Sequence, residues 1–335
     1  MSITDAVRAS CAKIAASARS VQIDLDAAAE VQPAATPPLD PTCHYLEGEP
    51  ADVADYMLAL DTINFGSGWF PTLRKRELDG RPVSGYFTVA WALADHVRAN
   101  GPPTSDWLAR VSTAEIAGIL GQRPDHELMS LYAQALRELG RFLAGASIAS
   151  SKSLGRSAGP ESAGLATHST GPTLQSTGPA PHAPAFRRAL DLVAEAGGSA
   201  ERLAEMLARG MAMFDDRGFY KRAQILASDL ALAGVAEFSD LDRLTIFADN
   251  LVPHVLRCDG VLVYDDRLAA HIDRGARLTF GGAEREIRAC ALHACELTSQ
   301  RSGVPARKID TWLWTRGQSH EYKSRPRHRC RTVFY

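Results

Sequence analysis

Cysteine is sparse in this sequence, and its spacing is not typical of a secreted or metal-binding protein. The chain of 335 residues has six cysteines and no C-x-x-C pair. Residues 1–20 lack the apolar core of a secretory signal, and no run approaches the ~20 apolar residues of a membrane span. We therefore expect a cytoplasmic protein with reduced thiols and no membrane partner. Because Cys290, His293 and Cys295 would lie on different faces of a helix, we expect no metal site.

An excess of charge of one sign is also lacking, except in one segment. Lys and Arg total 37 against 39 Asp and Glu, which gives a net charge of −2. A molecule of this charge is not built to coat nucleic acid. The exception is a basic cluster formed by Arg316, Lys323, Arg325, Arg327, Arg329 and Arg331. Either a solvated basic segment or a surface that faces a phosphate would explain this cluster.

Common nucleotide-binding and hydrolytic signatures are missing. The sequence has no G-x-x-x-x-G-K-[ST], H-E-x-x-H, G-x-S-x-G or dinucleotide fingerprint. Strand patterns are rare, since GVLVY (260–264) and RLTFGG (277–282) could form at most one short hairpin. Helical periodicity dominates and predicts an all-α fold.

Residues 148–183 differ in composition from the rest of the chain. Ser, Gly, Ala, Pro and Thr dominate this segment, and large apolar residues are few. Such a segment cannot bury enough apolar surface to offset its ordering entropy, so we predict a disordered insertion. It could separate two domains or interrupt one. We predict the second arrangement, in which the helical parts 1–147 and 184–335 pack together as one domain.

The apolar periodicity and the capping residues place the helices along the chain. Ser84 is the expected N-cap of a helix that ends at Asn100–Gly101, and Ser105 and Thr113 begin short helices. The other expected helices are 2–18, 51–64, 126–146, 184–196, 199–213, 219–233, 240–252, 264–274, 283–300 and 305–315.

Two of these helices carry charges in unfavourable places. Asp249 is expected near a helix C-terminus, and Lys221 and Arg222 follow Phe219 at a helix N-terminus, so each charge opposes the helix dipole. A boundary aspartate paired with Arg222 or Arg257, and cations that snorkel to solvent, would explain them without a site. The alternative is a catalytic carboxylate beside an anion-binding pair, because unpaired buried charges are costly.

Two further clusters combine aromatic rings with carboxyl or amide groups. They are Asp61, Asn64, Phe65 and Trp69 in LDTINFGSGWFP, and Asp310 with Trp314 in KIDTWLW. A helix C-cap with its turn, and ordinary core tryptophans, would account for them structurally. The same groups also suit a flat heterocycle, whose face stacks on the rings while polar groups read its edge.

Taken together, these motifs resemble the queuosine salvage protein family. The resemblance covers nearly the whole chain except 148–183. It is carried by LDTINFGSGWFP, SGYF at 84–87, FYKRAQILASDL, LTIFADNLVPHVL, GVLVY, EREIRACALHACEL, KIDTWLW and HRCRTVFY. FYKRAQI together with FADN-x-VP is the most specific part. His254 stands where many members have glutamine.

The resemblance implies an all-α fold similar to helical base-excision DNA glycosylases. It also implies hydrolysis of queuosine 5′-monophosphate to queuine and ribose 5-phosphate, for reuse of queuine in tRNA modification. Asp249 would be the catalytic carboxylate and Lys221 its ionic neighbour. The implied substrate-binding residues are Asp61, Asn64, Phe65, Trp69, Phe219, Arg222, Asp310 and Trp314. The partner would be a small-molecule nucleotide, and neither a metal nor a redox cofactor is needed.

Two other functions compete with this one. A helical glycosylase acting on bases in DNA or RNA would show salt-sensitive nucleic-acid binding, which the mild net charge argues against. A non-enzymatic helical interaction protein would leave Asp249 and Lys221 exposed and separate. A single cavity lined by these two residues with Phe65, Trp69 and Trp314 would favour the hydrolase. The sequence leaves the oligomeric state open.

Overall fold

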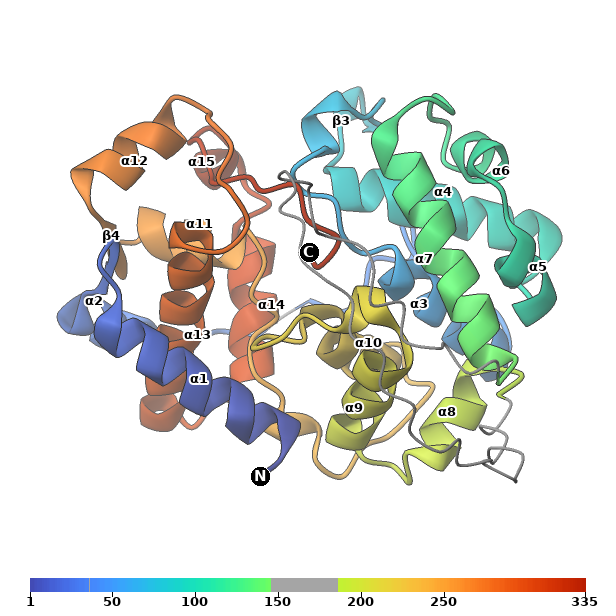
Figure 1. The fold of residues 1–335 in the computed structure, drawn as a ribbon, viewed down its shortest axis with the longest axis horizontal. Coiled ribbons are helices and arrows are strands. Elements are labelled where there is room, and N and C mark those ends of the chain that lie inside the picture. Colours follow the sequence, from blue (N-terminus) through green and yellow to red (C-terminus); the bar gives the residue numbers. More distant parts are fainter. Residues whose placement is uncertain (36, 146–185) are drawn as a thin grey trace, which may run out of the picture.

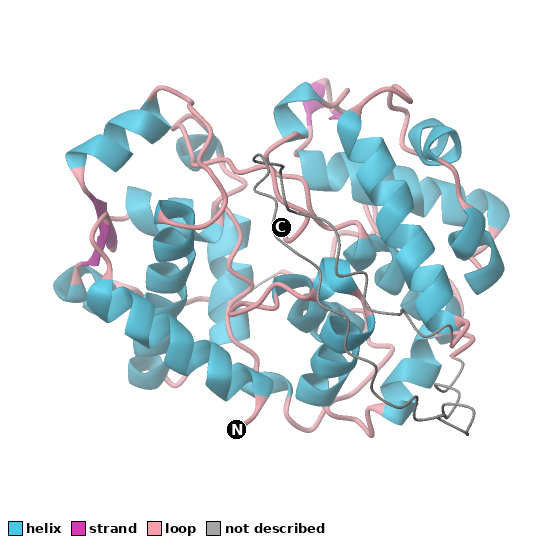
Figure 2. Cartoon of the chain, viewed as in Figure 1, coloured by secondary structure: helices cyan, strands magenta, loops and turns pink. Residues whose placement is uncertain are grey.

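The computed structural model describes residues 1–35, 37–145 and 186–335 (Figure 1). Most of them are helical (Figure 2), which confirms the all-α prediction. The first helices are α1 (Ile3–Ser17), α2 (Leu25–Glu30), α3 (Pro50–Thr62), α4 (Gly85–Asn100), α5 (Ser105–Arg110), α6 (Thr113–Ile119) and α7 (Glu127–Leu143). The later ones are α8 (Ala189–Glu195), α9 (Ala200–Gly210), α10 (Lys221–Leu232), α11 (Val252–Cys258), α12 (Asp266–Asp273), α13 (Ala283–Ser302), α14 (Ala306–Arg316) and α15 (His320–Lys323). The insertion predicted at 148–183 lies outside the described residues.

Side-chain caps fix several helix starts where the sequence predicts them. Ser84 Oγ accepts the N–H of Phe87 at 3.2 Å and begins α4. Gly101, with φ of 80°, ends the same helix in a conformation that glycine adopts without strain. Ser112 and Glu115 form a capping box at α6. These local signals explain why the bounds of α4 and α6 agree with the sequence patterns.

The strands are short, and they do not form the one hairpin that the sequence allowed. β1 (Val21–Ile23) pairs antiparallel with β4 (Leu262–Tyr264), and β2 (Glu77–Leu78) pairs with β3 (Arg81–Pro82). The hairpin that GVLVY and RLTFGG could at most have formed is absent, because 277–282 forms no strand. Pairing with β1 instead buries an apolar residue of each strand beside α13.

Two apolar clusters, here named the first and second core, organise the helices. The first core contains buried residues of α3–α10 together with Ile3 of α1, and the second contains those of the rest of α1, of α2 and of α11–α15. Figure 1 shows the two groups of helices side by side. The first core includes helices from both sides of the gap at 146–185, since α3 packs against α8 and α10.

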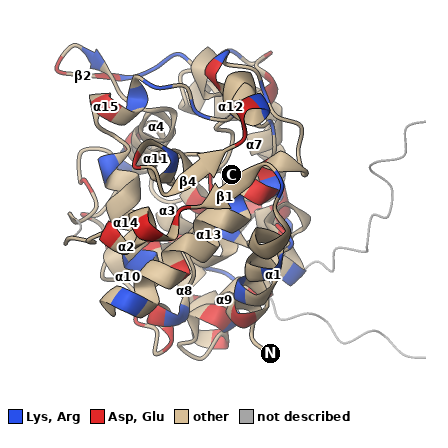
Figure 3. Ribbon diagram, turned by 90° about the vertical axis from the view of Figure 1, so that its left-hand side faces the viewer, with Lys and Arg blue, Asp and Glu red and all other residues tan. Residues whose placement is uncertain are grey.

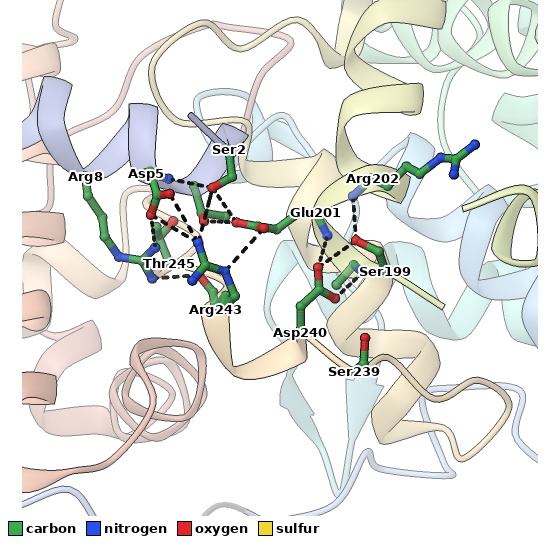
Figure 4. Close-up of polar contacts among 12 residues, drawn as sticks. Ser2, Asp5, Arg8, Ser199, Glu201, Arg202, Ser239, Asp240, Arg243 and Thr245 are labelled. Atoms are coloured by element: carbon green, nitrogen blue, oxygen red, sulfur yellow. Dashed lines mark hydrogen bonds and ion pairs between the residues drawn. The ribbon is translucent and has the colours of Figure 1, made fainter. Parts of the chain in front are cut away.

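A polar junction joins the two groups of helices at the start of α1 (Figure 4). Ser2 Oγ donates to Glu201 Oε1 at 2.7 Å, and Arg243 Nη2 donates to Asp5 at 3.2 Å. Asp240 accepts the first N–H groups of α9. Such partly exposed ion pairs add little stability. Their structural effect is to fix the chain just before residue 244, where the segment that leads to Asp249 begins.

Acidic and basic residues are interspersed over the side shown in Figure 3, in keeping with the net charge of −2. Among the residues with described structure, no helix has the length and apolar character needed to cross a bilayer.

The crossing of α5 and α7 provides a test of the fold. A Cβ at Gly140 would lie 2.2 Å from the backbone nitrogen of Ala109, so Gly140→Ala must push the two helices apart. We expect it to lower the free energy of unfolding by about 1–3 kcal/mol in urea titrations. Gly118→Ala in α6 is the matched control, because it meets no atom within 4 Å. It should stabilise the protein by up to about 1 kcal/mol. Equal effects of both changes would contradict the close crossing.

Candidate active site

One cavity collects most of the predicted site residues. Its volume is about 380 Å³, within the roughly 300–1,000 Å³ of typical small-molecule sites. Its walls come from the loop after α3, the start of α4, one face of α10, segment 247–251, α14 and residues near the C-terminus. Of the predicted residues, it is lined by Asn64, Phe65, Lys221, Asp249, Asp310 and Trp314. The competing expectation that Lys221 and Asp249 are exposed and separate is therefore wrong.

Asp249 lies before a helix N-terminus, not at a C-terminus. The predicted helix 240–252 is wrong, because only Leu241–Arg243 forms a short 3-10 turn before α11 begins. Asp249 Oδ1 accepts the N–H groups of Leu251 at 2.7 Å and Val252 at 3.1 Å, which the helix itself leaves unpaired. Asp249 Oδ2 has no hydrogen-bond partner in the described parts of the chain and remains available to a ligand.

Segment 244–249 is irregular because it runs between the two cores. Leu244 and Phe247 belong to the first core, whereas Ile246 and Ala248 belong to the second. Ile246, Phe247 and Ala248 alternate between the two cores, as successive side chains of an extended chain do. A helical wheel mistakes the same apolar residues for one stripe.

Side chains from three helices satisfy the backbone of this segment. Buried peptide groups need hydrogen-bond partners, and here the segment lacks helical ones. The three contacts are Thr245 N–H to Gln224 Oε1 (3.0 Å), Phe247 N–H to Asp310 Oδ1 (2.8 Å) and Arg288 Nε–H to Ala248 O (2.9 Å). The position of Asp249 therefore depends on α10, α14 and α13 together.

Lys221 is the first residue of α10 and is only 5% exposed. The preceding Tyr220 has φ of 51°, which is uncommon for a residue other than glycine and marks a constrained turn. Lys221 Nζ donates to Asn64 O at 3.1 Å and to Asn64 Oδ1 at 3.2 Å. Burial lowers the pKa of Lys221, while the nearby charges of Asp249 and Asp61 oppose this shift. Because both described acceptors belong to Asn64, the ammonium keeps a donor for a ligand.

Asp61 lies one layer behind the cavity wall. It is fully buried and does not line the cavity, so its predicted direct contact with a ligand is not supported by its position. Its Oδ1 accepts a hydrogen bond from Asn64 Nδ2 at 3.1 Å, and its Oδ2 is buried without a described partner. Burial raises the pKa of Asp61 to about 7, and the Asn64 hydrogen bond opposes the shift. Asp61 thus orients Asn64, which in turn contacts Lys221.

Asp310 and Trp314 line the cavity from one face of α14, as their i, i+4 spacing predicts. Burial, and then the neighbouring charge of Asp249, raises the pKa of Asp310 to about 8. This shift favours the protonated form of Asp310, which can donate a hydrogen bond. A proton donor beside a carboxylate acceptor is the usual arrangement for acid–base chemistry.

A buried ion pair connects the start of α10, which carries Lys221, with the segment that carries Asp249. Arg288 Nη1 and Nη2 contact Asp216 at 3.1 and 2.5 Å. Asp216 Oδ2 also accepts the N–H of Lys221 at 3.4 Å, while Arg288 Nε donates to the carbonyl just before Asp249. The Phe219 ring packs against the guanidinium, with its centroid 3.9 Å from Arg288 Cζ. The pair therefore fixes both residues through the backbone.

Besides Asp61, three predicted substrate-binding residues lie outside the cavity wall. Phe219 packs against the Arg288 guanidinium in the second core. Arg222 is 1% exposed and donates to backbone carbonyls, including Val333 O at 2.7 Å. Trp69 donates from Nε1 to Glu127 at 2.7 Å in a separate surface hollow. In each case the side chain contacts other parts of the protein and not the cavity. Sequence spacing does not distinguish such an internal contact from a contact with a ligand.

The cavity also contains residues that the sequence patterns did not single out as site residues. Asp229 lies on the α10 face that carries Lys221 and Ile225, and Tyr86 comes from the start of α4. The i, i+4, i+8 spacing on α10 is the one sequence signal for Asp229. Tyr86 lies in the quoted SGYF motif but has no spacing relation to the other residues.

A group of four basic residues, here named the cavity cluster, adjoins the cavity. It consists of Lys75, Lys323, Arg327 and Arg329, and Arg327 lines the cavity together with Phe70. Lys75 Nζ lies 5.4 Å from the Phe70 ring centroid. Burial lowers the pKa of Lys75 to about 8, and the positive charges of the other three members add to the shift. None of the four forms an ion pair with a residue in the described ranges. Burial lowers the pKa of Arg327, and the nearby charge of Asp249 opposes this shift.

In residues 1–35, 37–145 and 186–335, no group of three His, Cys, Asp or Glu side chains is arranged to hold a metal ion.

Comparison with known proteins gives consistent results. A family model described as "Queuosine salvage protein" matches residues 180–335. A protein of Sphaerobacter thermophilus named queuosine 5′-phosphate N-glycosylase/hydrolase is 31% identical over 348 aligned residues, which cover 96% of this chain and 95% of that protein. Proteins of the same name from Dictyostelium discoideum and Mus musculus are 37% and 31% identical. Those alignments cover 35% and 44% of this chain, and 40% and 51% of the respective relatives.

The buried ion pair predicts a specific stability pattern. Arg288→Met leaves Asp216 buried without its partner, so we expect the free energy of unfolding to fall by about 3–5 kcal/mol. Urea titration measures this loss. Arg285→Met on the same helix is the control, because Arg285 donates to an exposed carbonyl. Adding Asp216→Leu to Arg288→Met should recover part of the loss. A loss no larger than that of the control would contradict the role of the pair.

Proposed function

Because this chain belongs to the queuosine salvage protein family, we propose that it hydrolyses the N-glycosidic bond of queuosine 5′-monophosphate and releases queuine and ribose 5-phosphate. The observation that carries this proposal is the single cavity in which Asp249, Lys221 and Asp310 meet an aromatic wall. Family membership confirms the resemblance seen in the sequence motifs. The cytoplasmic location, the absence of a nucleic-acid partner and the likeness to DNA glycosylases stay predictions.

Asp249 serves the sugar side of the reaction. Breaking an N-glycosidic bond builds oxocarbenium-like positive charge on the ribose. The Oδ2 atom of Asp249 can stabilise this charge or orient the attacking water, because its Oδ1 already binds two peptide N–H groups. The same hydrogen bonds restrict rotation of the carboxylate. Lys221 uses its remaining N–H to position a ribose oxygen.

Asp310 serves the departing base. A 7-deazaguanine has carbon where guanine has N7, so protonation of that atom cannot assist departure. Negative charge on the leaving ring must instead be stabilised by hydrogen bonds at other ring atoms. Asp310 has a pKa raised to about 8 by burial and by Asp249, and so it retains a proton to donate. Phe65 and Trp314 supply aromatic faces for the ring.

The cavity cluster is the binding site for the 5′-phosphate. Lys75 and Arg327 form no ion pair within the described residues; Lys75 lies over the Phe70 ring, and Arg327 lines the cavity together with Phe70. A phosphate dianion would relieve the mutual repulsion of these cations and gain charge-assisted hydrogen bonds. This assignment selects the phosphate-facing interpretation of the basic segment over the solvated one.

The central test is release of free base by the purified full chain. Queuosine, its 5′-monophosphate, ordinary nucleotides and oligonucleotides should be incubated separately, with base release followed by chromatography. We expect queuine from the 5′-monophosphate. Release only from an oligonucleotide would favour a nucleic-acid glycosylase instead, and no release from any substrate would favour an interaction protein.

Asp249→Asn should lower kcat by roughly 10³-fold or more, because the carboxylate charge is lost at the developing cation. The amide oxygen can still accept the two N–H groups of α11, so we expect an unchanged melting temperature. Asp242→Asn, an exposed aspartate in the 3-10 turn of the same connection, is the control with normal turnover. Turnover by Asp249→Asn equal to that control would refute the catalytic role.

Lys75→Gln and Arg327→Gln should each raise KM for the 5′-monophosphate by roughly 10- to 100-fold, as expected for loss of one charge-assisted hydrogen bond. KM for the bare nucleoside should change little. Arg325→Gln is the control, because Arg325 is exposed and is not among the charges that act on Lys75. Equal effects on nucleotide and nucleoside would place the phosphate elsewhere.

A further inference from the structure

Asp229 is the buried cavity residue for which neither the fold nor the proposed chemistry gives a use. It is 7% exposed and lines the cavity from α10. Its carboxyl has no hydrogen bond or ion pair with any residue of the described ranges. A buried carboxyl without a partner costs free energy, so this side chain does not stabilise the empty protein. Its presence is explained if a ligand supplies the missing partner.

The position of Asp229 relates it to the reacting groups. Lys221, Ile225 and Asp229 share one face of α10, and all three line the cavity. The rise of an α-helix separates the first and last of them by about 12 Å along the axis. Lys221 stands at the proposed sugar end, so Asp229 stands at the far end of the same wall. A group that reaches Asp229 must extend from the base away from the glycosidic bond.

The neighbours of Asp229 favour a cation. Tyr86 and Trp314 line the cavity and meet edge to face, with ring centroids 5.5 Å apart. Burial, and then the charge of Asp229, raises the pKa of Tyr86. Burial, and then Asp61, raises the pKa of Asp229 well above its usual range, with Lys221 opposing. Aromatic faces beside an uncompensated carboxyl are typical of ammonium sites.

We propose that Asp229 is a specificity-determining residue that binds the secondary ammonium on the 7-position arm of the substrate's 7-deazaguanine base. The inference rests on the proposed function, because the substrate named there carries such an arm. A bound ammonium favours the ionised form of Asp229, so the two groups form a charge-assisted hydrogen bond. The edges of Tyr86 and Trp314 close the site around the methylene groups. Ordinary guanine nucleotides have no group to place there, so they leave Asp229 unpartnered and are disfavoured.

Binding of free bases tests the inference without requiring turnover. Isothermal titration calorimetry of the full chain and its Asp229→Asn variant should use three bases. Queuine carries the whole arm, 7-aminomethyl-7-deazaguanine keeps an ammonium without the ring, and 7-deazaguanine has neither. We expect Asp229→Asn to weaken the first two by roughly 10- to 100-fold and to leave the third unchanged. Asp215→Asn, a partly exposed surface aspartate paired with Arg217, should leave all three unchanged.

The outcomes separate this inference from the proposed function. An equal loss of affinity for all three bases, the result if Asp229 bound the guanine edge, overturns the inference. Unchanged affinity for all three bases also overturns it. Wild-type protein that binds no base also overturns it. Queuine release by the wild type with unaltered base binding in Asp229→Asn overturns this inference alone. Absence of queuine release from the 5′-monophosphate overturns the function. Melting temperatures establish that the variant is folded, which the near-isosteric amide favours.

Discussion

The ion pair between Arg288 and Asp216 is the interaction on which the geometry of the cavity depends. Both side chains are buried, and replacing a pair of this kind by apolar residues often leaves stability unchanged or raises it. Its value here is geometric. One partner accepts the N–H of Lys221, and the other donates to the carbonyl preceding Asp249. The ion pair thereby fixes the positions of Lys221 and Asp249 relative to each other, although they lie on segments that pack in different cores.

The cavity gathers carboxyl groups that oppose its own stability. Burial raises the pKa of Asp61 to about 7 and that of Asp310 to about 8. A carboxyl with a raised pKa stabilises the fold fully only below its ordinary value near 3.8, and this contribution is lost as pH rises through 7 to 8. The protein therefore gives up stability near neutral pH at its candidate site. Pre-organised sites commonly carry such a cost.

Local signals in the sequence predict most of the helices, because caps and periodic apolar faces act within one helix. Ser84 and Gly101 define α4 in this way. The prediction failed at 240–252, where the apolar residues face two different cores and long-range side chains replace helical hydrogen bonds. Motif order pointed to Lys221 and Asp249 as neighbours of one cavity, although their local structure was misjudged. Trp69, Phe219 and Arg222 share these motifs but make internal contacts, and a motif does not separate the two uses.

The cavity lies at the seam between the two cores, and this has a mechanical consequence. α10 contributes its apolar side chains to the first core, and α14 contributes Ile309 and Leu313 to the second. A molecule held between Lys221 and Asp310 would act as a non-covalent cross-link between the two groups of helices. Occupancy would then damp their relative motion, and part of the binding free energy would appear as cohesion of the whole chain.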